Sequence, residues 1–131
     1  MKTKTIRQTV NISANPQAVF DALIDSRKHS AFTGDTARVS RKVGGKFSAY
    51  GGYCYGVNLK LVKSKKIVQT WRASDWPEGL FSKASFDMRK TTSGTKLTFT
   101  QSGVPANQLK SVKQGWTEFY WEPLKKMLTK K

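Results

Sequence analysis

The last quarter of the chain, residues 103–131, constrains the fold more than any other stretch. Its apolar residues recur at steps of three or four, which places them on one broad face of a single long helix. They are Leu109, Val112, Trp116, Phe119, Tyr120, Leu124, Met127 and Leu128. Burying each of them would contribute roughly 1.5 to 3 kcal/mol, more than helix propensity gives. This helix therefore needs a large apolar surface to pack against.

Three residues of this segment depart from an ideal amphipathic helix. Pro123 lies in its interior and predicts a kink, because proline lacks an N–H and clashes with the preceding turn. Gly115 gives up roughly 1 kcal/mol of helix propensity relative to alanine, which indicates close packing of another backbone or ring at that point. Trp121 falls away from the face of Trp116, so it either covers the helix edge or forms an exposed contact.

The residues before this helix read mostly as strands. Residues 4–13 alternate apolar and polar side chains, which predicts a half-buried first strand. Two short helices follow, the first capped by Asn15 and opened by Pro16, the second over residues 27–32. Residues 37–102 show repeated strand and turn signals. We predict an α+β fold in which a curved antiparallel sheet of about six to seven strands wraps around the long C-terminal helix.

The space between this sheet and the final helix is one candidate site. Residues 53–62 form the clearest strand, with Tyr53 and Tyr55 on one face and Cys54 and Gly56 on the other. The residues expected to line a pocket for a small hydrophobic ligand are Tyr53, Tyr55, Trp71, Trp116 and Tyr120. Tyrosine hydroxyls would give such a pocket a few orienting polar points. The alternative is that the same rings fill the space completely.

The loop over residues 76–79 is the other candidate site. Pro77 and Gly79 shape a turn, and the adjacent Trp76 either plugs the end of the sheet or projects as a binding anchor. We assign Trp76, Glu78 and Trp121 as partner-binding candidates.

Charge and cysteine content bear on partners and compartment. The chain has 24 Lys and Arg against 8 Asp and Glu, a net charge of +16, which favours acidic partners. No nucleic-acid-binding motif accompanies this charge, so no specific nucleic-acid binding is expected. Cys54 is the single cysteine, and neither a signal peptide nor a membrane span is evident. We expect a cytoplasmic, monomeric, single-domain protein over residues 1–131 that does not bind membranes.

The sequence contains no recognisable catalytic or metal-binding arrangement. His29 is the only histidine and has no cysteine or carboxylate cluster beside it, so we interpret it as a surface residue. Cys54 has no activating neighbour in sequence and is interpreted as a small strand residue. We therefore expect no enzyme activity, no cofactor and no metal.

Several segments carry a family resemblance. The most specific are WPEG at residues 76–79 and GW-x-x-x-Y-x-EPLK at residues 115–125, and the matching segments cover nearly the whole chain in order. The chain resembles the C-terminal domain of the Aha-type activators of the ninety-kilodalton heat-shock chaperone ATPase. These domains belong to the START and birch-pollen-allergen superfamily. The resemblance implies a helix-grip fold, no enzymatic activity, and binding to the chaperone dimer.

Two functional hypotheses follow. The first is a non-catalytic, co-chaperone-like regulator that binds the ninety-kilodalton heat-shock chaperone and stimulates its ATPase, with Trp76 and Trp121 as anchors. The similar activators have two domains, so a lone domain lacks the avidity of linked contacts and would stimulate weakly. The alternative is a binder or carrier of a small hydrophobic ligand in the cavity beneath the last helix.

Overall fold

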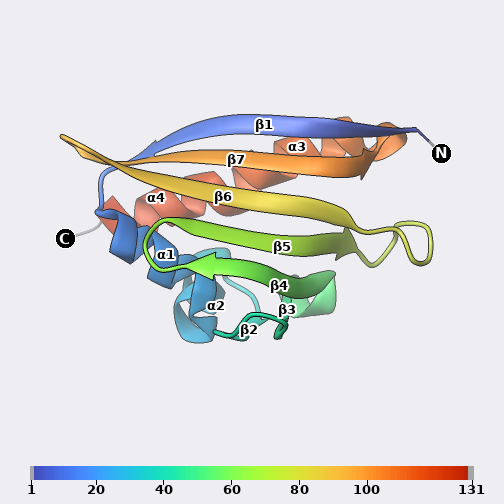
Figure 1. Ribbon diagram of the computed structural model, residues 1–131, viewed down its shortest axis with the longest axis horizontal. Helices are drawn as coiled ribbons and strands as arrows, with labels where there is room; N and C mark the ends of the chain where they lie inside the picture. The colour runs from blue at the N-terminus through green and yellow to red at the C-terminus, as the bar shows by residue number, and fades with distance from the viewer. Residues whose placement is uncertain (1, 130–131) are drawn as a thin grey trace.

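Seven antiparallel strands form a single curved sheet (Figure 1). The structure is a computed structural model that describes residues 2–129. The strands are β1 Thr3–Ile12, β2 Arg38–Val39, β3 Lys46–Ala49, β4 Cys54–Val62, β5 Lys66–Ala73, β6 Ser82–Thr91 and β7 Gly94–Pro105. Their order in the sheet is β1-β7-β6-β5-β4-β3-β2, so the first strand pairs with the last and the others form a meander.

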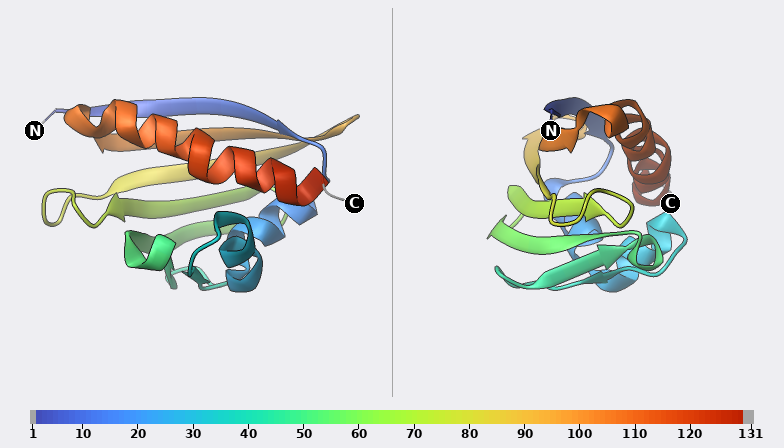
Figure 2. Two further views of the ribbon diagram at one scale, coloured as in Figure 1. Left: turned by 180° about the vertical axis from the view of Figure 1, so that it is seen from behind. Right: turned by 90° about the vertical axis from the view of Figure 1, so that its right-hand side faces the viewer.

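The helices lie on one side of this sheet (Figures 1 and 2). They are α1 Pro16–Ile24, α2 Ser26–Thr33, α3 Leu109–Trp116 and α4 Glu122–Thr129, with short 3₁₀ turns η1 Tyr50–Gly52 and η2 Ala106–Gln108. The predicted Asn15 cap is present, because its side chain accepts from the Ala18 N–H, and Gly34 ends α2 in the left-handed conformation. No helix within residues 2–129 is long and apolar enough to cross a membrane.

A π-helical turn, η3 Thr117–Trp121, joins α3 to α4 into one long C-terminal helix that crosses the sheet diagonally (Figure 2, left). Pro123, where we predicted a kink, lies in the first turn of α4 directly after this π-helical turn. The proline provides no N–H to the carbonyl four residues earlier, that of Phe119, which accepts a hydrogen bond from the Tyr50 hydroxyl instead. This bond ties η1 to the helix. The predicted α+β helix-grip architecture, with its two short helices after the first strand, is therefore confirmed.

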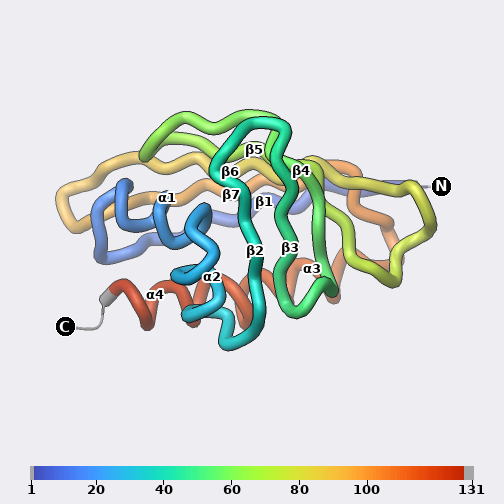
Figure 3. Tube along the Cα trace, turned by 90° about the horizontal axis from the view of Figure 1, so that it is seen from below, coloured from blue at the N-terminus to red at the C-terminus, as the bar shows by residue number. Residues whose placement is uncertain are grey.

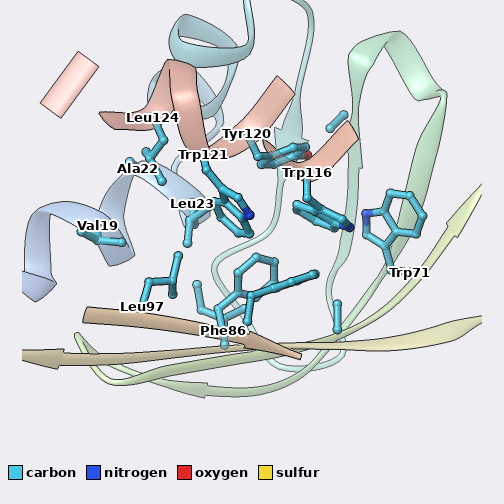
Figure 4. Packing of buried hydrophobic residues seen from close by; sticks show 14 of the residues in the cluster. Val19, Ala22, Leu23, Trp71, Phe86, Leu97, Trp116, Tyr120, Trp121 and Leu124 are labelled. Atoms are coloured by element: carbon cyan, nitrogen blue, oxygen red, sulfur yellow. The ribbon is translucent and has the colours of Figure 1, made fainter. Parts of the chain in front are cut away.

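The wide turn also places Trp121 differently from our expectation. Trp116 and Trp121 are both buried, with ring centroids 5.4 Å apart and nearly parallel planes. In a regular α-helix, residues five apart point in different directions, whereas the longer π turn brings them onto the same face. Figure 4 shows both rings directed from the helix toward the sheet.

The core lies between the inner face of the sheet and the helices (Figure 4). Trp116 packs on Phe99, with ring centroids 4.4 Å apart, and Leu97 and Leu124 have no exposed surface. In β4 the predicted alternation holds from Cys54 to Asn58, but the face that carries Cys54 is the buried one, and a bulge between Asn58 and Lys60 then turns Leu61 inward. Tyr55 lies on the opposite, outer face.

Candidate functional site

A cavity of about 310 Å³ lies between the C-terminal helix, η1 and the adjoining ends of β4 and β5. Its lining residues are Tyr50, Tyr53, Cys54, Trp71, Ser111, Val112, Gly115, Trp116, Phe119 and Tyr120. Phe119 and Tyr53 are 54% and 49% exposed, so they form a mouth that opens to solvent. The space is therefore not filled by its aromatic residues.

Four of the five predicted lining residues are in this cavity: Tyr53, Trp71, Trp116 and Tyr120. Tyr55 does not line it, because it lies on the outer face of β4 and contacts Phe81 there. The close packing predicted at Gly115 is also wrong. A Cβ atom at Gly115 would meet only the Phe119 ring, at 3.8 Å. The missing side chain of this glycine therefore leaves space in the cavity that it lines.

One polar group in the wall has no partner. The Trp71 side chain is 6% exposed, and its indole Nε1–H has no hydrogen-bond acceptor within residues 2–129. Leaving a buried donor unpaired costs roughly 1 to 3 kcal/mol. The nitrogen lies on the side of the ring that faces Trp116 (Figure 4) and has essentially no accessible surface, so a molecule in the cavity does not reach it.

A buried polar chain lies behind the cavity and includes His29, which we expected at the surface. His29 is 5% exposed, because its ring packs on Phe32 and Tyr120. Its Nδ1 lies 3.0 Å from the Leu23 carbonyl oxygen and therefore carries the proton, so Nε2 accepts from the Tyr120 hydroxyl at 3.1 Å. The Cys54 thiol donates to the Ala49 carbonyl oxygen at 3.8 Å and lies close enough to the Tyr120 hydroxyl for the two groups to influence each other's pKa.

Burial keeps the side chains of His29, Tyr120 and Cys54 uncharged at neutral pH. Desolvation lowers the pKa of His29, raises the pKa of Cys54 to about 12, and raises the pKa of Tyr120 well above its ordinary value. A protonated thiol is a poor nucleophile. The arrangement therefore stabilises the packing of α2 on the C-terminal helix rather than activating a catalytic group. Within the described residues no cluster of three His, Cys, Asp or Glu side chains is placed to hold a metal ion.

Two glutamines on the sheet hold the tryptophans of the final helix. Trp116 Nε1 donates to Gln101 Oε1 and Trp121 Nε1 donates to Gln8 Oε1, both at 2.8 Å. Gln101 Nε2 then donates to Ser82 Oγ at 2.8 Å. We did not predict these contacts. The available signal was that Gln8 and Gln101 interrupt the apolar, inward-facing positions of their strands.

The predicted partner-binding residues do not form one surface. Trp76 is 4% exposed and packs edge to face on Trp71, with ring centroids 5.3 Å apart. Trp121 is 3% exposed against the sheet, so the expectation that these two rings project as anchors is wrong. In both cases ring burial outweighs the exposed alternative. Glu78 is exposed at the loop tip, as expected.

Curated relatives match this chain over most of its length. An activator of 90 kDa heat shock protein ATPase homolog from Dictyostelium discoideum is 33% identical over 117 residues, which cover 87% of this chain and 30% of the relative. Homolog 1 from Homo sapiens is 31% identical over 92% of this chain and 35% of its own length. The chain thus spans about a third of the length of these relatives.

Solved structures extend the comparison to the fold. An HSP90 activator from Plasmodium falciparum superposes with a TM-score of 0.89 and 28% identity, over 95% of this chain and 96% of that one. An Aha1 dimer from Colwellia psychrerythraea, 21% identical over 95% of this chain and 96% of its own, has the same fold with a TM-score of 0.81. The family model described as Activator of Hsp90 ATPase homolog 1-like protein matches residues 13–129, so this chain belongs to that family.

Proposed function

We propose that this domain binds a ninety-kilodalton heat-shock chaperone and regulates its ATPase without catalysing a reaction itself. The observation that carries the proposal is the likeness to the Plasmodium falciparum HSP90 activator, which extends over 96% of that chain with a TM-score of 0.89. The names of the curated relatives support the same role. The protonated, buried state of Cys54 and Tyr120 supports a binding function over a catalytic one.

The charge of the domain supports a role in association. A net charge of +16 raises the rate at which the domain meets an acidic surface, and this effect weakens as salt screens it. Affinity that survives added salt must come from packed, desolvated contacts. A salt series therefore separates specific binding from general attraction.

The test is an NMR titration of the isotope-labelled domain with the ninety-kilodalton chaperone of the same organism, at physiological and doubled salt. We expect shifts confined to one surface at both salt concentrations, and a change in the ATPase rate of the chaperone when the domain is added. Absent shifts, or diffuse shifts that disappear at doubled salt, would contradict the proposal.

The cavity supports a second candidate function, binding of a small, mostly apolar molecule. The specific observation is a cavity of about 310 Å³ that opens to solvent and is lined mainly by aromatic side chains. An aromatic or aliphatic molecule of matching size would bury its apolar surface against these rings.

Gly115 offers a matched pair of variants for testing this second function. Gly115→Leu extends a side chain into the cavity, whereas Gly115→Ala adds one methyl group with space for it. We expect aromatic ketones and alcohols, such as acetophenone and 2-naphthol, to raise the melting temperature of the wild type and of Gly115→Ala but not of Gly115→Leu. No shift in any protein, or equal shifts in all three, would refute cavity binding.

A further inference from the structure

We propose that the outer face of the sheet, the face turned away from the helices, is the surface on which this domain meets its partner, and that the partner presents an acidic protein surface there. The identity of that partner rests on the proposed function. Seen along the sheet, every helix lies on the inner side and the outer face is uncovered (Figures 2 and 3).

The strand register identifies the side chains on this face. Lys46 pairs with Val57 on β4, Thr70 on β5 pairs with Lys83 on β6, and Lys83 pairs with Ser102 on β7. Neighbouring rows follow the same alternation, and their inward counterparts are the buried core residues. Apart from the buried Arg72, the outward cations across the seven strands are Arg7, Arg38, Lys46, Lys60, Lys66, Lys83, Arg89 and Lys96.

The fold supplies almost no counter-charge to these cations. Asp87 is the only acidic residue in the seven strands, and its carboxylate pairs with Lys66 Nζ at 3.3 Å. Arg89 lies directly opposite Lys96, an arrangement of like charges that destabilises a sheet. An acidic surface laid on this face would neutralise charges that the domain itself leaves unbalanced.

An aromatic anchor lies in the same face. Tyr55 and Phe81 are 37% and 43% exposed, and the Arg72 guanidinium carbon is 5.7 Å from the centre of each ring. Arg72 is held in place by carbonyl oxygens of the following loop, including Pro77 O at 2.6 Å and Trp76 O at 2.9 Å. Rings fixed in this way lose little conformational freedom on binding, which favours them as affinity anchors.

The size and ring geometry of the face favour a protein over a nucleic acid. The strands have 2 to 12 residues, and their mean length is about 25 Å at roughly 3.3 Å per residue. With six interstrand spacings of about 4.8 Å the face covers roughly 700 Å², close to the ~800 Å² that each partner contributes to a standard protein interface. The rings of Tyr55 and Phe81 meet at 80°, so they cannot both lie parallel to successive stacked bases.

The test compares two charge-reversed variants with the same net charge. Lys46→Glu/Lys83→Glu alters the outer face, and Lys110→Glu/Lys113→Glu alters exposed positions of α3. Circular dichroism and thermal melts establish that both are folded. With the chaperone as titrant, we expect the outer-face variant to bind at least tenfold more weakly and the α3 variant to stay within threefold of the wild type. Equal weakening of both variants, or none in either, would overturn the surface assignment while leaving chaperone binding intact.

Phe81→Ala tests the anchor separately. We expect it to lower chaperone affinity at least fivefold without changing the salt dependence, because it removes apolar contact and no charge. Unchanged affinity in a folded Phe81→Ala protein would count against the anchor.

Two further titrations keep the surface testable if the wild type does not bind the chaperone, an outcome that refutes the proposed function alone. With poly-L-glutamate as the probe, we expect NMR shifts on the outer face, and shifts located elsewhere would reject the proposal. With single-stranded RNA of equal charge as the probe, tighter binding than to poly-L-glutamate, lost in Phe81→Ala, would reject a protein partner.

Discussion

The contact between Trp116 and Gln101 should be one of the main energetic links between the C-terminal helix and the sheet. Gln101 is fully buried, accepts from Trp116 Nε1 and donates to Ser82 Oγ. Gln101→Leu keeps a similar volume but leaves the indole N–H without an acceptor, which costs roughly 1 to 3 kcal/mol. The same substitution also removes the hydrogen bond from Gln101 to Ser82 Oγ. This second loss costs less, about 0.5 to 1 kcal/mol, because the Ser82 hydroxyl still donates to the Trp71 carbonyl oxygen. The expected loss of unfolding free energy is therefore about 2 to 4 kcal/mol.

A chemical-denaturation series with a double-mutant cycle measures this loss. At about 2.1 cal/mol/K of unfolding entropy per residue, the same loss lowers the melting temperature of a 131-residue chain by roughly 7 to 15 °C. Trp116→Phe removes the N–H, so Gln101→Leu should cost about 1 to 3 kcal/mol less in that background than in the wild type. A coupling energy below about 0.5 kcal/mol would refute the view that this hydrogen bond secures the helix.

Three further outcomes are expected. Because the pKa of His29 is lowered in the folded protein, the unfolded chain binds a proton on this residue at a higher pH than the folded chain does. The free energy of unfolding should therefore fall as the pH drops below about 6.5, by at most ~1.4 kcal/mol per pH unit, and less steeply in His29→Gln. The same pH dependence in both proteins, measured by urea denaturation at several pH values, would refute this. Gly56→Ala should destabilise the fold by roughly 3 kcal/mol, because its Cβ would lie 1.8 Å from the Thr70 carbonyl oxygen. Gly115→Ala should instead stabilise it by up to about 1 kcal/mol, because a Cβ has space there and alanine favours a helix. A melting temperature of Gly56→Ala equal to or above that of Gly115→Ala would contradict this description of the two sites. Cys54 should resist thiol reagents at pH 8 until urea unfolds the chain, because burial raises its pKa to about 12. Rapid labelling of Cys54 in the folded protein would show that the thiol is accessible and contradict this expectation.

The overall architecture could be read from the sequence because local periodicity carries it. The alternation of β1 and the capping of α1 by Asn15 are set by neighbouring residues, and the structure has both. The long amphipathic helix was equally clear. These features depend on steps of two, three or four residues, which a single sequence displays directly.

The orientation of individual side chains at the site could not be read in the same way. A π-helical turn directs Trp121 inward. The 3.6-residue period of a regular α-helix, on which the prediction relied, does not include the extra residue of such a turn. Tyr55 was placed inside because it alternates with the apolar Val57 and Leu59. The covered face is instead the one with Asn58, whose buried amide is satisfied by hydrogen bonds to Ser40 and Gln69 that a single sequence does not display. His29 and Tyr120 are 91 residues apart, so their contact is a property of the tertiary fold.

The tryptophan cluster also determines how this protein will look in optical spectroscopy. All four tryptophans lie in one continuous series of ring contacts, from Trp76 to Trp71 at 5.3 Å, to Trp116 at 5.6 Å and to Trp121 at 5.4 Å. Excitation absorbed by one indole will migrate through the others before emission, so the fluorescence belongs to the cluster and depolarises within it. Coupled transitions among rings held at fixed angles should also give strong near-ultraviolet circular dichroism. Tryptophan fluorescence and near-ultraviolet circular dichroism should therefore both report, as one signal, whether the final helix is packed on the sheet.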